Sequence, residues 1–249
     1  MNMSFDKKIV LITGASKGIG AQLADDFGRL KAKLILTAAH PDGLKKIKEL
    51  VHKRKYKADC YHLDFTDAAS IRNFLVHLGK YKQIDVCVNN AGINEVDFIE
   101  QVREEAWDNI MNVNLKGPFL IIRAIAPKMK KNGYGRIVNI SSIFGLVTRE
   151  KRSIYSASKS GLLGLTRTTA IELARFNVLV NAVSPGFVLT DLTRRMLSKS
   201  EMQKLTENIP LGRMAAPQDI SSTILFLSSG LNSYIVGQNF IVDGGYVTV

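Results

Sequence analysis

The feature that most constrains the fold of this chain is a glycine-rich loop between an apolar run and a helical pattern. Residues 8–13 read Lys-Ile-Val-Leu-Ile-Thr, which suits a parallel strand buried on both faces. Gly14-Ala15-Ser16-Lys17-Gly18-Ile19-Gly20 follows, and apolar residues then recur at helical spacing at Ile19, Leu23, Phe27 and Leu30. Glycines let a backbone approach a pyrophosphate, and a helix start supplies free N–H groups. The loop therefore predicts a dinucleotide-phosphate site at Gly14, Ser16, Lys17, Gly18, Ile19 and Gly20. Its G-x-x-x-G-x-G spacing differs from the common G-x-G-x-x-G.

Strand-like and helical segments alternate along the rest of the chain. Further strands are predicted at 33–37, 58–63, 84–88, 136–140, 178–183 and 239–242. Further helices are predicted at 41–53, 68–78, 104–129, 154–176 and 217–229. Asp67 is expected to cap the helix at 68–78, and Gly117-Pro118 to disturb the helix at 104–129. With no internal repeat or linker, this order predicts one α/β domain over residues 1–249 with a doubly wound parallel sheet. Residues 187–216 would form a polar, partly helical insertion on the substrate side.

A second motif opens the helix predicted at 154–176. Tyr155 and Lys159 are four positions apart, so they project from the same helix face. A free tyrosine titrates near pH ~10, and a neighbouring ammonium lowers that pKa by favouring the phenolate. The pair predicts a device for proton transfer. Two exposed helical side chains would give the same pattern, so this interpretation depends on the rest of the chain.

Composition narrows the setting of this chemistry. Apolar residues make up 46% of the 249 residues, enough for a sizeable core. No apolar run approaches the ~18 residues that span a membrane, and the short polar start is not expected to be a signal peptide. Cys60 and Cys87 lie in apolar, strand-like runs, which is typical of reduced core thiols in a cytoplasmic protein. The four histidines show no metal-ligand spacing, so no metal site is expected.

The net charge of +12 raises the question of nucleic-acid binding. The basic residues are scattered over helical faces and loops, without interleaved aromatic residues. They include Lys45, Lys46, Lys48, those in 53–57, 128–131 and 149–152, Arg194 and Arg195. This pattern favours a solvated surface, with attraction of phosphorylated or acidic substrates as the alternative. Neither nucleic acid nor a membrane is expected as a partner.

Taken in order, the motifs resemble those of the short-chain dehydrogenase/reductase family over essentially the whole chain. They are Thr13-Gly14-x-x-x-Gly18-x-Gly20, Asn89-Asn90-Ala91-Gly92, Asn114, Ser142, Tyr155-x-x-x-Lys159 and Pro185-Gly186. The resemblance implies a Rossmann-like, three-layer α/β/α fold with seven parallel strands. It also implies a nicotinamide cofactor, hydride transfer to or from a carbonyl or secondary alcohol, and usually a homotetramer.

The resemblance also implies roles for individual residues. Tyr155 would exchange a proton with the substrate oxygen, and Ser142 would hydrogen-bond that oxygen where charge develops. Lys159 would lower the pKa of Tyr155 and hold the nicotinamide ribose. Asn114 would anchor a water molecule that relays protons. Further cofactor contacts are implied for Asp64 at the adenine, and for Asn90, Ala91, Gly92, Pro185, Gly186 and Thr190.

The end of the second strand bears on the choice of cofactor. Enzymes that prefer NAD usually place a carboxylate there to bind the ribose 2′-hydroxyl. Here the residues after Leu36 are Thr37-Ala38-Ala39-His40, and no acid appears before Asp42. Lys17 is well placed for a 2′-phosphate, so we expect NADP(H) to be preferred over NAD(H). The arginine that many NADP-preferring relatives carry here is missing, and His40 replaces it only in part.

The substrate is left more open. The overall likeness is to 3-oxoacyl-acyl-carrier-protein reductases, so a carrier-bound 3-oxoacyl thioester is the leading prediction. However, Asn132 and Phe176 stand where those enzymes carry arginines for the carrier protein. The charged segment between Ser142 and Tyr155 instead resembles relatives that act on sugars and polyols. A cofactor-binding regulator without catalysis is the remote alternative, and the intact catalytic residues argue against it.

The three cations Arg149, Lys151 and Arg152 lie between Ser142 and Tyr155, so their loop is expected to pass close to the substrate mouth. They would be either a solvated surface loop or an attractor of anionic substrates. In the second case they would mainly raise the association rate, and salt would screen the effect.

The helices at 104–129 and 154–176 carry more apolar residues than one face of a sheet is expected to cover. These include Trp107, Ile110, Met111, Phe119 and Ile122 on the first helix and Leu162, Leu165, Thr169 and Leu173 on the second. An exposed apolar face usually marks an interface. We therefore expect a symmetric dimer through these helices and a tetramer through the last strand and residues 246–249.

Overall fold

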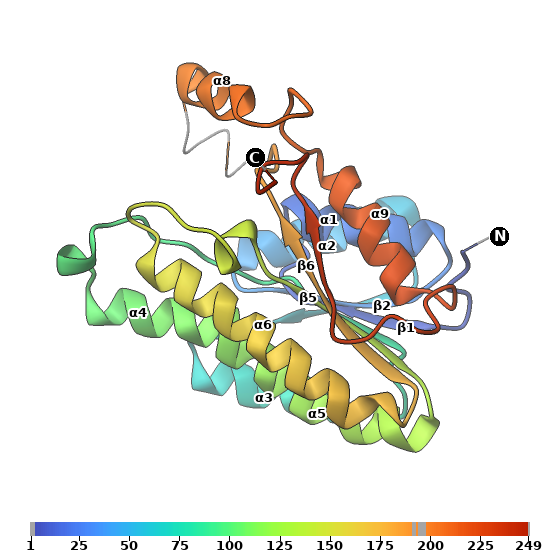
Figure 1. Ribbon diagram of the computed structural model, residues 1–249. Coiled ribbons are helices and arrows are strands. Elements are labelled where there is room, and N and C mark those ends of the chain that lie inside the picture. Colours follow the sequence, from blue (N-terminus) through green and yellow to red (C-terminus); the bar gives the residue numbers. More distant parts are fainter. Residues whose placement is uncertain (1–2, 191–192, 194–197, 249) are drawn as a thin grey trace.

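A computed structural model describes residues 3–190, 193 and 198–248. Its centre is a sheet of seven strands, all pairing in parallel, in the order β3-β2-β1-β4-β5-β6-β7 (Figure 1). The strands are β1 Ile9–Ile12, β2 Lys33–Ala38, β3 Ala58–His62, β4 Val86–Asn89, β5 Gly135–Ile140, β6 Val178–Pro185 and β7 Asn239–Val242. The Rossmann-like parallel sheet of seven strands is thus confirmed.

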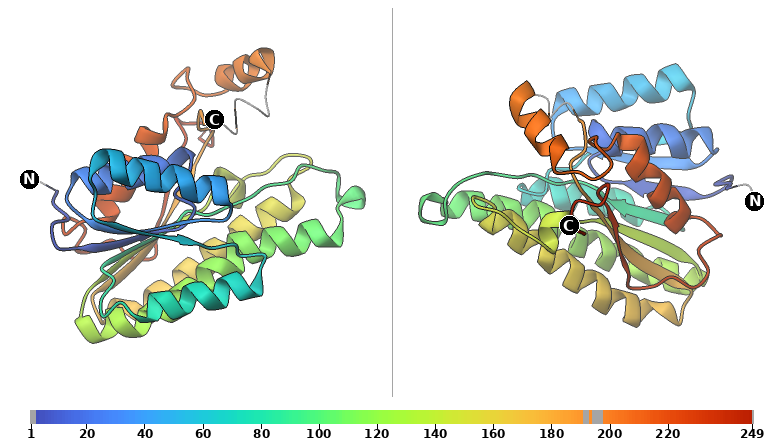
Figure 2. Two further views of the ribbon diagram at one scale, coloured as in Figure 1. Left: turned by 180° about the vertical axis from the view of Figure 1, so that it is seen from behind. Right: turned by 45° about the horizontal axis from the view of Figure 1, so that its top comes forward.

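Helices cover both faces of the sheet, which gives three layers (Figure 2). One face carries α1 Gly18–Arg29, α2 Pro41–Arg54 and α9 Pro217–Ser228. The other carries α3 Ala68–Gly79, α4 Glu104–Met111, α5 Gly117–Asn132 and α6 Ser153–Ala174. Because neighbouring residues of a strand point to opposite faces, β1 supplies Val10 to one layer and Leu11 to the other. That explains why its sequence is apolar throughout.

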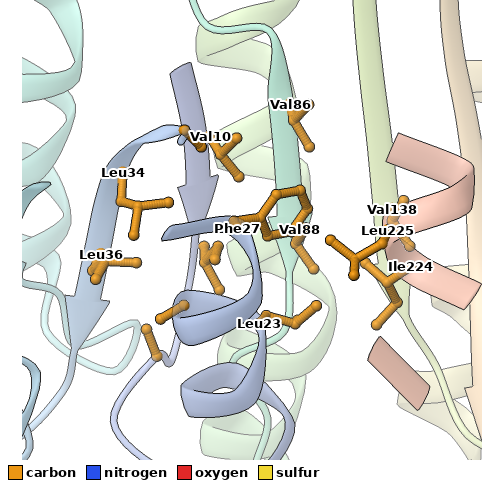
Figure 3. Packing of buried hydrophobic residues seen from close by; sticks show 14 of the residues in the cluster. Val10, Leu23, Phe27, Leu34, Leu36, Val86, Val88, Val138, Ile224 and Leu225 are labelled. Atoms are coloured by element: carbon orange, nitrogen blue, oxygen red, sulfur yellow. The ribbon is translucent and has the colours of Figure 1, made fainter. Parts of the chain in front are cut away.

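Figure 3 shows the packing on the α1 side of the sheet. Phe27 and Leu23 of α1 lie over Val10 and Val88, and Leu225 of α9 extends the same layer. On the opposite face, α3, α5 and α6 bury Phe74, Ile125 and Leu173 against Leu11, Ile35 and Ile137. Because apolar packing covers both faces of the sheet, a ligand can approach it at the ends of the strands.

The strand order reverses between β1 and β4, because β2 and β3 lie on one side of β1 and the later strands on the other. In doubly wound sheets, ligands bind outside the carboxyl ends of the strands at such a switch point. The glycine loop follows β1 and residues 90–92 follow β4, so the topology brings these two segments to the switch point.

The predicted helix at 104–129 is interrupted, as Gly117-Pro118 indicated. Helix α4 ends at Met111, a π-helical turn covers Asn112–Lys116, and α5 begins at Gly117. Pro118 has no N–H to donate to the carbonyl of Asn114, and its ring would crowd that carbonyl in a regular helix. The wider turn avoids this conflict and sets Asn114 at its centre. Such turns are frequent at functional sites.

Other expectations were confirmed with shifted ends. Asp67 caps α3 by accepting from the N–H groups of Ala69 and Ser70. Within 187–216, helix α8 spans Lys199–Glu207 and is capped by Ser198 and Glu201. Arg194 and Arg195 lie outside the described residues, as do residues 1–2, 191–192, 196–197 and Val249. In the part of the chain that is described, no helix could span a membrane.

The apolar residues proposed for a helical interface are divided between core and surface. Ile110, Ile122, Leu162 and Leu173 are at most 5% exposed, so they pack inside the chain and are not available to an interface. Their neighbours Trp107, Phe119 and Ile171 are exposed. The sheet and the neighbouring helices therefore bury several apolar residues of both helices, while others stay on the surface.

Candidate active site

The turn after β1 is fixed by hydrogen bonds to the ends of two neighbouring strands. The hydroxyl Oγ1 of Thr13 accepts from the backbone N–H groups of Asn90 and Ala91, at 3.0 and 3.1 Å. The side-chain amide of Asn90 donates to the carbonyls of Thr13 and Gly14, each at 3.0 Å. From the other side, Gly14 N–H donates to Thr37 Oγ1 at 3.3 Å and Ala15 N–H to Thr37 O at 2.8 Å. The glycine loop is thus tied to β2 and β4 at once.

At the start of α1, beyond this turn, no capping or acidic side chain of the described residues occupies the place that a phosphate would take. Lys17 occupies the N-cap position, makes no side-chain capping bond, and no acid lies in the first turn. Gly20 allows no side chain, because a Cβ there would collide with the carbonyl oxygen of Gly14. Gly18 has φ +55°, and a Cβ on it would lie 3.2 Å from Thr190 Cγ2. Free N–H groups, a positive helix end and a close backbone approach fit the phosphates of a dinucleotide.

The second part of the site lies where β5 passes into the first turns of α6. Tyr155 is in the first turn of α6, and Ser142 follows β5 and caps a short 3₁₀ turn at Ile143–Gly145. Ser142 lies close enough to Tyr155 to influence the pKa of its hydroxyl. The ring of Phe144 packs edge-on against that of Tyr155, with the centroids 6.3 Å apart. A hydroxyl pair at the carboxyl end of β5 is thus held by packing on one side and a strand end on the other.

Lys159 and Asn114 complete this cluster. Lys159 is 3% exposed, and its Nζ donates to the carbonyl of Ile140 at 2.8 Å and lies 5.6 Å from the centroid of the Tyr155 ring. Both N–H groups of the Asn114 amide donate, to the Ile93 carbonyl and to Ser158 Oγ, and Oδ1 accepts from Ile93 N–H, which leaves one acceptor site of Oδ1 for a further partner. Asn114 Oδ1 and Lys159 Nζ would lie 3.5 and 3.6 Å from a Cβ on Gly92. Gly92 therefore keeps open the space that these two side chains border.

Several groups act on the pKa of Tyr155. Burial raises it, whereas the neighbouring Ser142 hydroxyl and the positive charge of Arg152 lower it. Burial also lowers the pKa of Lys159 to about 8. Lys159 Nζ, 5.6 Å from the centroid of the Tyr155 ring, donates to the Ile140 carbonyl. Arg152, the residue before α6, is thus a second cation near the tyrosine.

The remaining predicted cofactor residues line the same edge of the sheet. Asp64 follows β3, and its Oδ1 accepts from the N–H and hydroxyl of Thr66, which leaves Oδ2 available. Pro185 ends β6, and Gly186 donates to the Val242 carbonyl. Ala91 is packed so closely on Gly14 that its Cα would lie 2.8 Å from a Cβ there. Helix α1 begins with Gly18 and Ile19, and Thr190 lies beside Gly18. Gly18 and Thr190 border a hollow of about 310 Å³.

The end of β2 carries no carboxylate. Ala39 and His40 follow β2, and His40 is the exposed N-cap of α2. Ser16 lies against α2, since its Oγ would be 3.0 Å from a Cβ on Gly43. Lys17 is exposed on the glycine loop. The surface between the loop and α2 is thus polar or cationic where a 2′-hydroxyl-binding acid would stand.

Several site residues were not recognised from the sequence as functional. Ser158 links the catalytic helix to Asn114, because its hydroxyl receives the Asn114 amide and donates to the Tyr155 carbonyl. Phe144 supports Tyr155 and also contacts Arg149 and Arg152. Ser158 could have been suspected from its position one turn after Tyr155. Nothing in the sequence marked the ring of Phe144.

Comparisons with known proteins agree over the whole chain. Residues 14–247 match the family model described as enoyl-(acyl carrier protein) reductase. The chain is 39% identical over 246 residues to the 3-oxoacyl-[acyl-carrier-protein] reductase FabG of Thermotoga maritima, which covers 98% of this chain and 100% of that protein. It is 36% identical to the FabG of Salmonella typhimurium, with 99% and 100% covered. A crystal structure described as a candidate NAD(P)-dependent gluconate 5-dehydrogenase from Beutenbergia cavernae, with bound NADP, superposes with a TM-score of 0.93 at 32% identity, covering 99% of each chain.

Proposed function

This chain belongs to the short-chain dehydrogenase/reductase family, and from that premise we propose that it is an NADP(H)-dependent 3-oxoacyl-thioester reductase. The family membership makes it an oxidoreductase that acts on carbonyl or alcohol groups and binds a nicotinamide cofactor. The observation that carries the proposal is the convergence of Ser142, Tyr155, Lys159 and Asn114 beside the glycine loop. Full-length relatives named as 3-oxoacyl reductases support the thioester as substrate.

The chain's own residues account for the proton side of the reaction. The bound nicotinamide supplies the hydride that reaches the carbonyl carbon. Tyr155 donates its hydroxyl proton to the carbonyl oxygen, and Ser142 donates a hydrogen bond to that oxygen as charge develops. Lys159 then returns a proton toward Tyr155, for which a pKa of about 8 suits it. Asn114 holds the segment at Ile93 in place and, as we propose, a water molecule that connects Lys159 with solvent.

The proposed preference for NADP(H) follows from the surface between the glycine loop and α2. A 2′-phosphate carries negative charge, and Lys17 and His40 are both exposed there without a carboxylate at the end of β2. The remaining cofactor-binding residues are those predicted above, with Asp64 at the adenine and Asn90, Gly92 and Thr190 along the riboses and phosphates. The NADP-bound relative from B. cavernae is consistent with this preference.

A sugar-acid or polyol dehydrogenase is the second candidate function. The relative from B. cavernae is named for gluconate, and the loop before Tyr155 carries three cations that a neutral acyl chain does not require. In favour of the thioester, apolar side chains border the same mouth, since Ile93, Val96 and Leu146 are at least 38% exposed. The two candidates therefore differ in which part of the mouth contacts the substrate.

The experiment is a screen of NADPH oxidation by the purified protein with acetoacetyl thioesters, keto-sugars, keto-gluconate and a simple diketone. We expect the thioester to have the highest kcat/KM, and NADPH to exceed NADH by at least about tenfold, a difference of about 1.4 kcal/mol. Turnover of keto-gluconate alone would replace the thioester by the second candidate. Failure with every ketone would leave the non-catalytic, cofactor-binding regulator.

Assembly and location remain predictions of the same proposal. Exposed Trp107, Phe119 and Ile171 mark the helical face for a dimer, and exposed Tyr234 and Ile241 lie near the last strand, where a tetramer contact was expected. Light scattering at micromolar concentration should give a multiple of the 27.5 kDa chain mass, and a monomer would contradict it. The acyl carrier protein is a proposed partner, and a cytoplasmic location is proposed by analogy with the reductases it resembles.

A further inference from the structure

The three cations of the loop before α6 do not occupy equivalent positions. Arg149 and Lys151 are exposed, and Lys151 lies over the ring of Phe98 at 4.3 Å from its centroid. Arg152 is half-buried, and its Nε and Nη1 are enclosed with no hydrogen-bond partner among the residues that the structure describes. A loop that merely exposed its charges to solvent would not enclose one of them. Arg152 therefore needs an explanation of its own.

The surroundings of Arg152 offer it stacking but no counter-charge. Its guanidinium lies 5.6 Å from the centroid of the Phe144 ring, and that of Arg149 lies at the same distance from it. Among the described residues, no carboxylate forms an ion pair with either arginine. Burial and the neighbouring charge of Arg149 both lower the pKa of Arg152. Stacking on an aromatic ring offsets only part of the cost of burying an unpaired charge.

Other unpaired polar atoms and an open space lie in the same segments. Like the two nitrogens of Arg152, Asn94 Oδ1 and Ser153 Oγ are buried without a hydrogen-bond partner in the described part of the chain. A hollow of about 380 Å³ is lined by Val96 and by residues 149–152. Val96 belongs to the segment after β4 that Asn114 holds through Ile93. The hollow is therefore bordered by the same segment that Asn114 holds.

The hollow also lies within reach of Tyr155. Phe144 contacts both groups, since its ring is 6.3 Å from that of Tyr155 and 5.6 Å from the Arg152 guanidinium. The positive charge of Arg152 is close enough to lower the pKa of Tyr155. Arg152 is also the N-cap of α6, three positions before Tyr155. A small molecule whose carbonyl oxygen faces Tyr155 could thus carry an anionic group to Arg152.

We propose that Arg152, assisted by Arg149, binds the carboxylate of a small oxo acid whose carbonyl is reduced at Tyr155. This rests on the proposed function in that Tyr155 is the proton donor. The two parallel N–H groups of a guanidinium match the two oxygens of a carboxylate. In a 3-oxo acid the carboxylate occupies the position of the thioester carbonyl in a 3-oxoacyl thioester. The protein therefore reduces free oxo acids as a further activity.

The chemistry balances without another reactant. Hydride passes from NADPH to the carbonyl carbon, and the Tyr155 proton passes to the carbonyl oxygen. The products are NADP⁺ and the 3-hydroxy acid, and Tyr155 regains its proton from solvent. The carboxylate takes no part in bond changes, so Arg152 acts as a specificity-determining residue.

The test compares an acid with its neutral ester. Acetoacetate and ethyl acetoacetate share the reacting ketone but differ in charge at the position assigned to Arg152. With NADPH, we expect Arg152→Gln to lower kcat/KM for acetoacetate about 30-fold, because a charge-assisted bidentate pair is lost. Because the Arg152 charge also acts on Tyr155, its loss should lower kcat/KM for both substrates by a common factor, so the acid-to-ester ratio of kcat/KM is the readout. We expect that ratio to fall at least about tenfold. Arg152→Lys should recover part of the loss, since it keeps the charge without the bidentate geometry.

A matched control is Lys131→Gln, which removes one exposed cation at the end of α5, outside the residues that line the hollow. It should change the acid-to-ester ratio less than about twofold, and that change should vanish at high salt. A binding readout without turnover is calorimetric titration of acetoacetate into the protein saturated with NADP⁺. Wild type should bind, and Arg152→Gln should bind at least about tenfold more weakly.

The outcomes separate this inference from the proposed function. Equal losses for acid and ester would assign Arg152 only to Tyr155 and overturn the carboxylate site, as would no loss for either substrate. If Arg152→Gln does not fold, a wild-type preference for the ester over the acid overturns it equally. Reduction of acetoacetyl thioester without reduction of acetoacetate would retain the proposed function and reject the inference. The opposite result would reject the thioester and retain the inference.

Discussion

Around the glycine loop, polar groups find partners on neighbouring strand ends, whereas around residues 149–153 buried polar atoms have none. Thr13 and Asn90 engage four backbone groups between them. Arg152 and Ser153 leave buried nitrogen and oxygen atoms without a partner in the described part of the chain. The first region must hold a cofactor common to the family, so a rigid frame suits it. For the second region, we propose contact with the part of the substrate that differs from one substrate to another.

This difference indicates where the chain keeps stability and where it keeps specificity. Unsatisfied buried polar groups cost free energy, and they persist where function requires them. Lys159 resembles the second region, because its buried positive charge has a carbonyl rather than a carboxylate as its partner. The catalytic cluster thus joins a satisfied cofactor side to an unsatisfied substrate side.

The largest expected effect is a loss of turnover that leaves the cofactor-binding region unchanged. Tyr155→Phe removes the proton donor and should lower kcat roughly 10³-fold. The affinity for NADPH, measured by fluorescence titration, should change little, because the glycine loop does not depend on this hydroxyl. Ser142→Ala should also lower kcat. A variant that retained more than about a tenth of wild-type kcat would show that Tyr155 is not the proton donor.

A second prediction concerns the stability that buried Lys159 costs. Its pKa is lowered from 10.5 to about 8 in the folded state, so between those pH values the unfolded chain binds more protons. Stability from this group therefore rises with pH through that window and is lowest below it. Lys159→Met should be more stable than wild type at pH 7, by roughly 2 kcal/mol.

The check is urea unfolding of both proteins without cofactor over a pH series. The advantage of Lys159→Met should shrink as pH rises from about 8 toward 10. A constant difference across that series would mean that Lys159 is paired or hydrated, and the contrast with the glycine loop would be weaker. Arg175→Met, at an exposed site, serves as the control for simple loss of a cation.

The smallest expected effect compares the two regions directly with one hydroxyl from each. Thr13→Val leaves the N–H groups of Asn90 and Ala91 without their acceptor, which should cost about 2 kcal/mol. Ser153→Ala removes a hydroxyl that is buried without a partner, so stability should stay the same or increase. Thermal unfolding measures both. Equal losses in the two variants would remove the distinction between the regions.

Much of the fold follows from local sequence patterns. The apolar run before Gly14, the alternation of strands and helices and the cap at Asp67 are properties of adjacent residues, so the sequence predicted them to within a few positions. The glycine loop, Tyr155 and Lys159 were placed by motif spacing in the same way. The broken helix at Asn112–Lys116 was foreseen from Pro118, although its π-helical form was not.

The tertiary structure decided what the side chains contact. Sequence treated Arg149, Lys151 and Arg152 as one cationic loop, but Arg152 is the half-buried one of the three, with its guanidinium over the ring of Phe144. Sequence placed Lys159 beside Tyr155, and the structure adds a carbonyl partner for its ammonium, Ile140 at the end of β5, and a second cation near the tyrosine, Arg152. Burial and partners depend on residues far away in the chain, so spacing alone determines the position of a charge but not its environment.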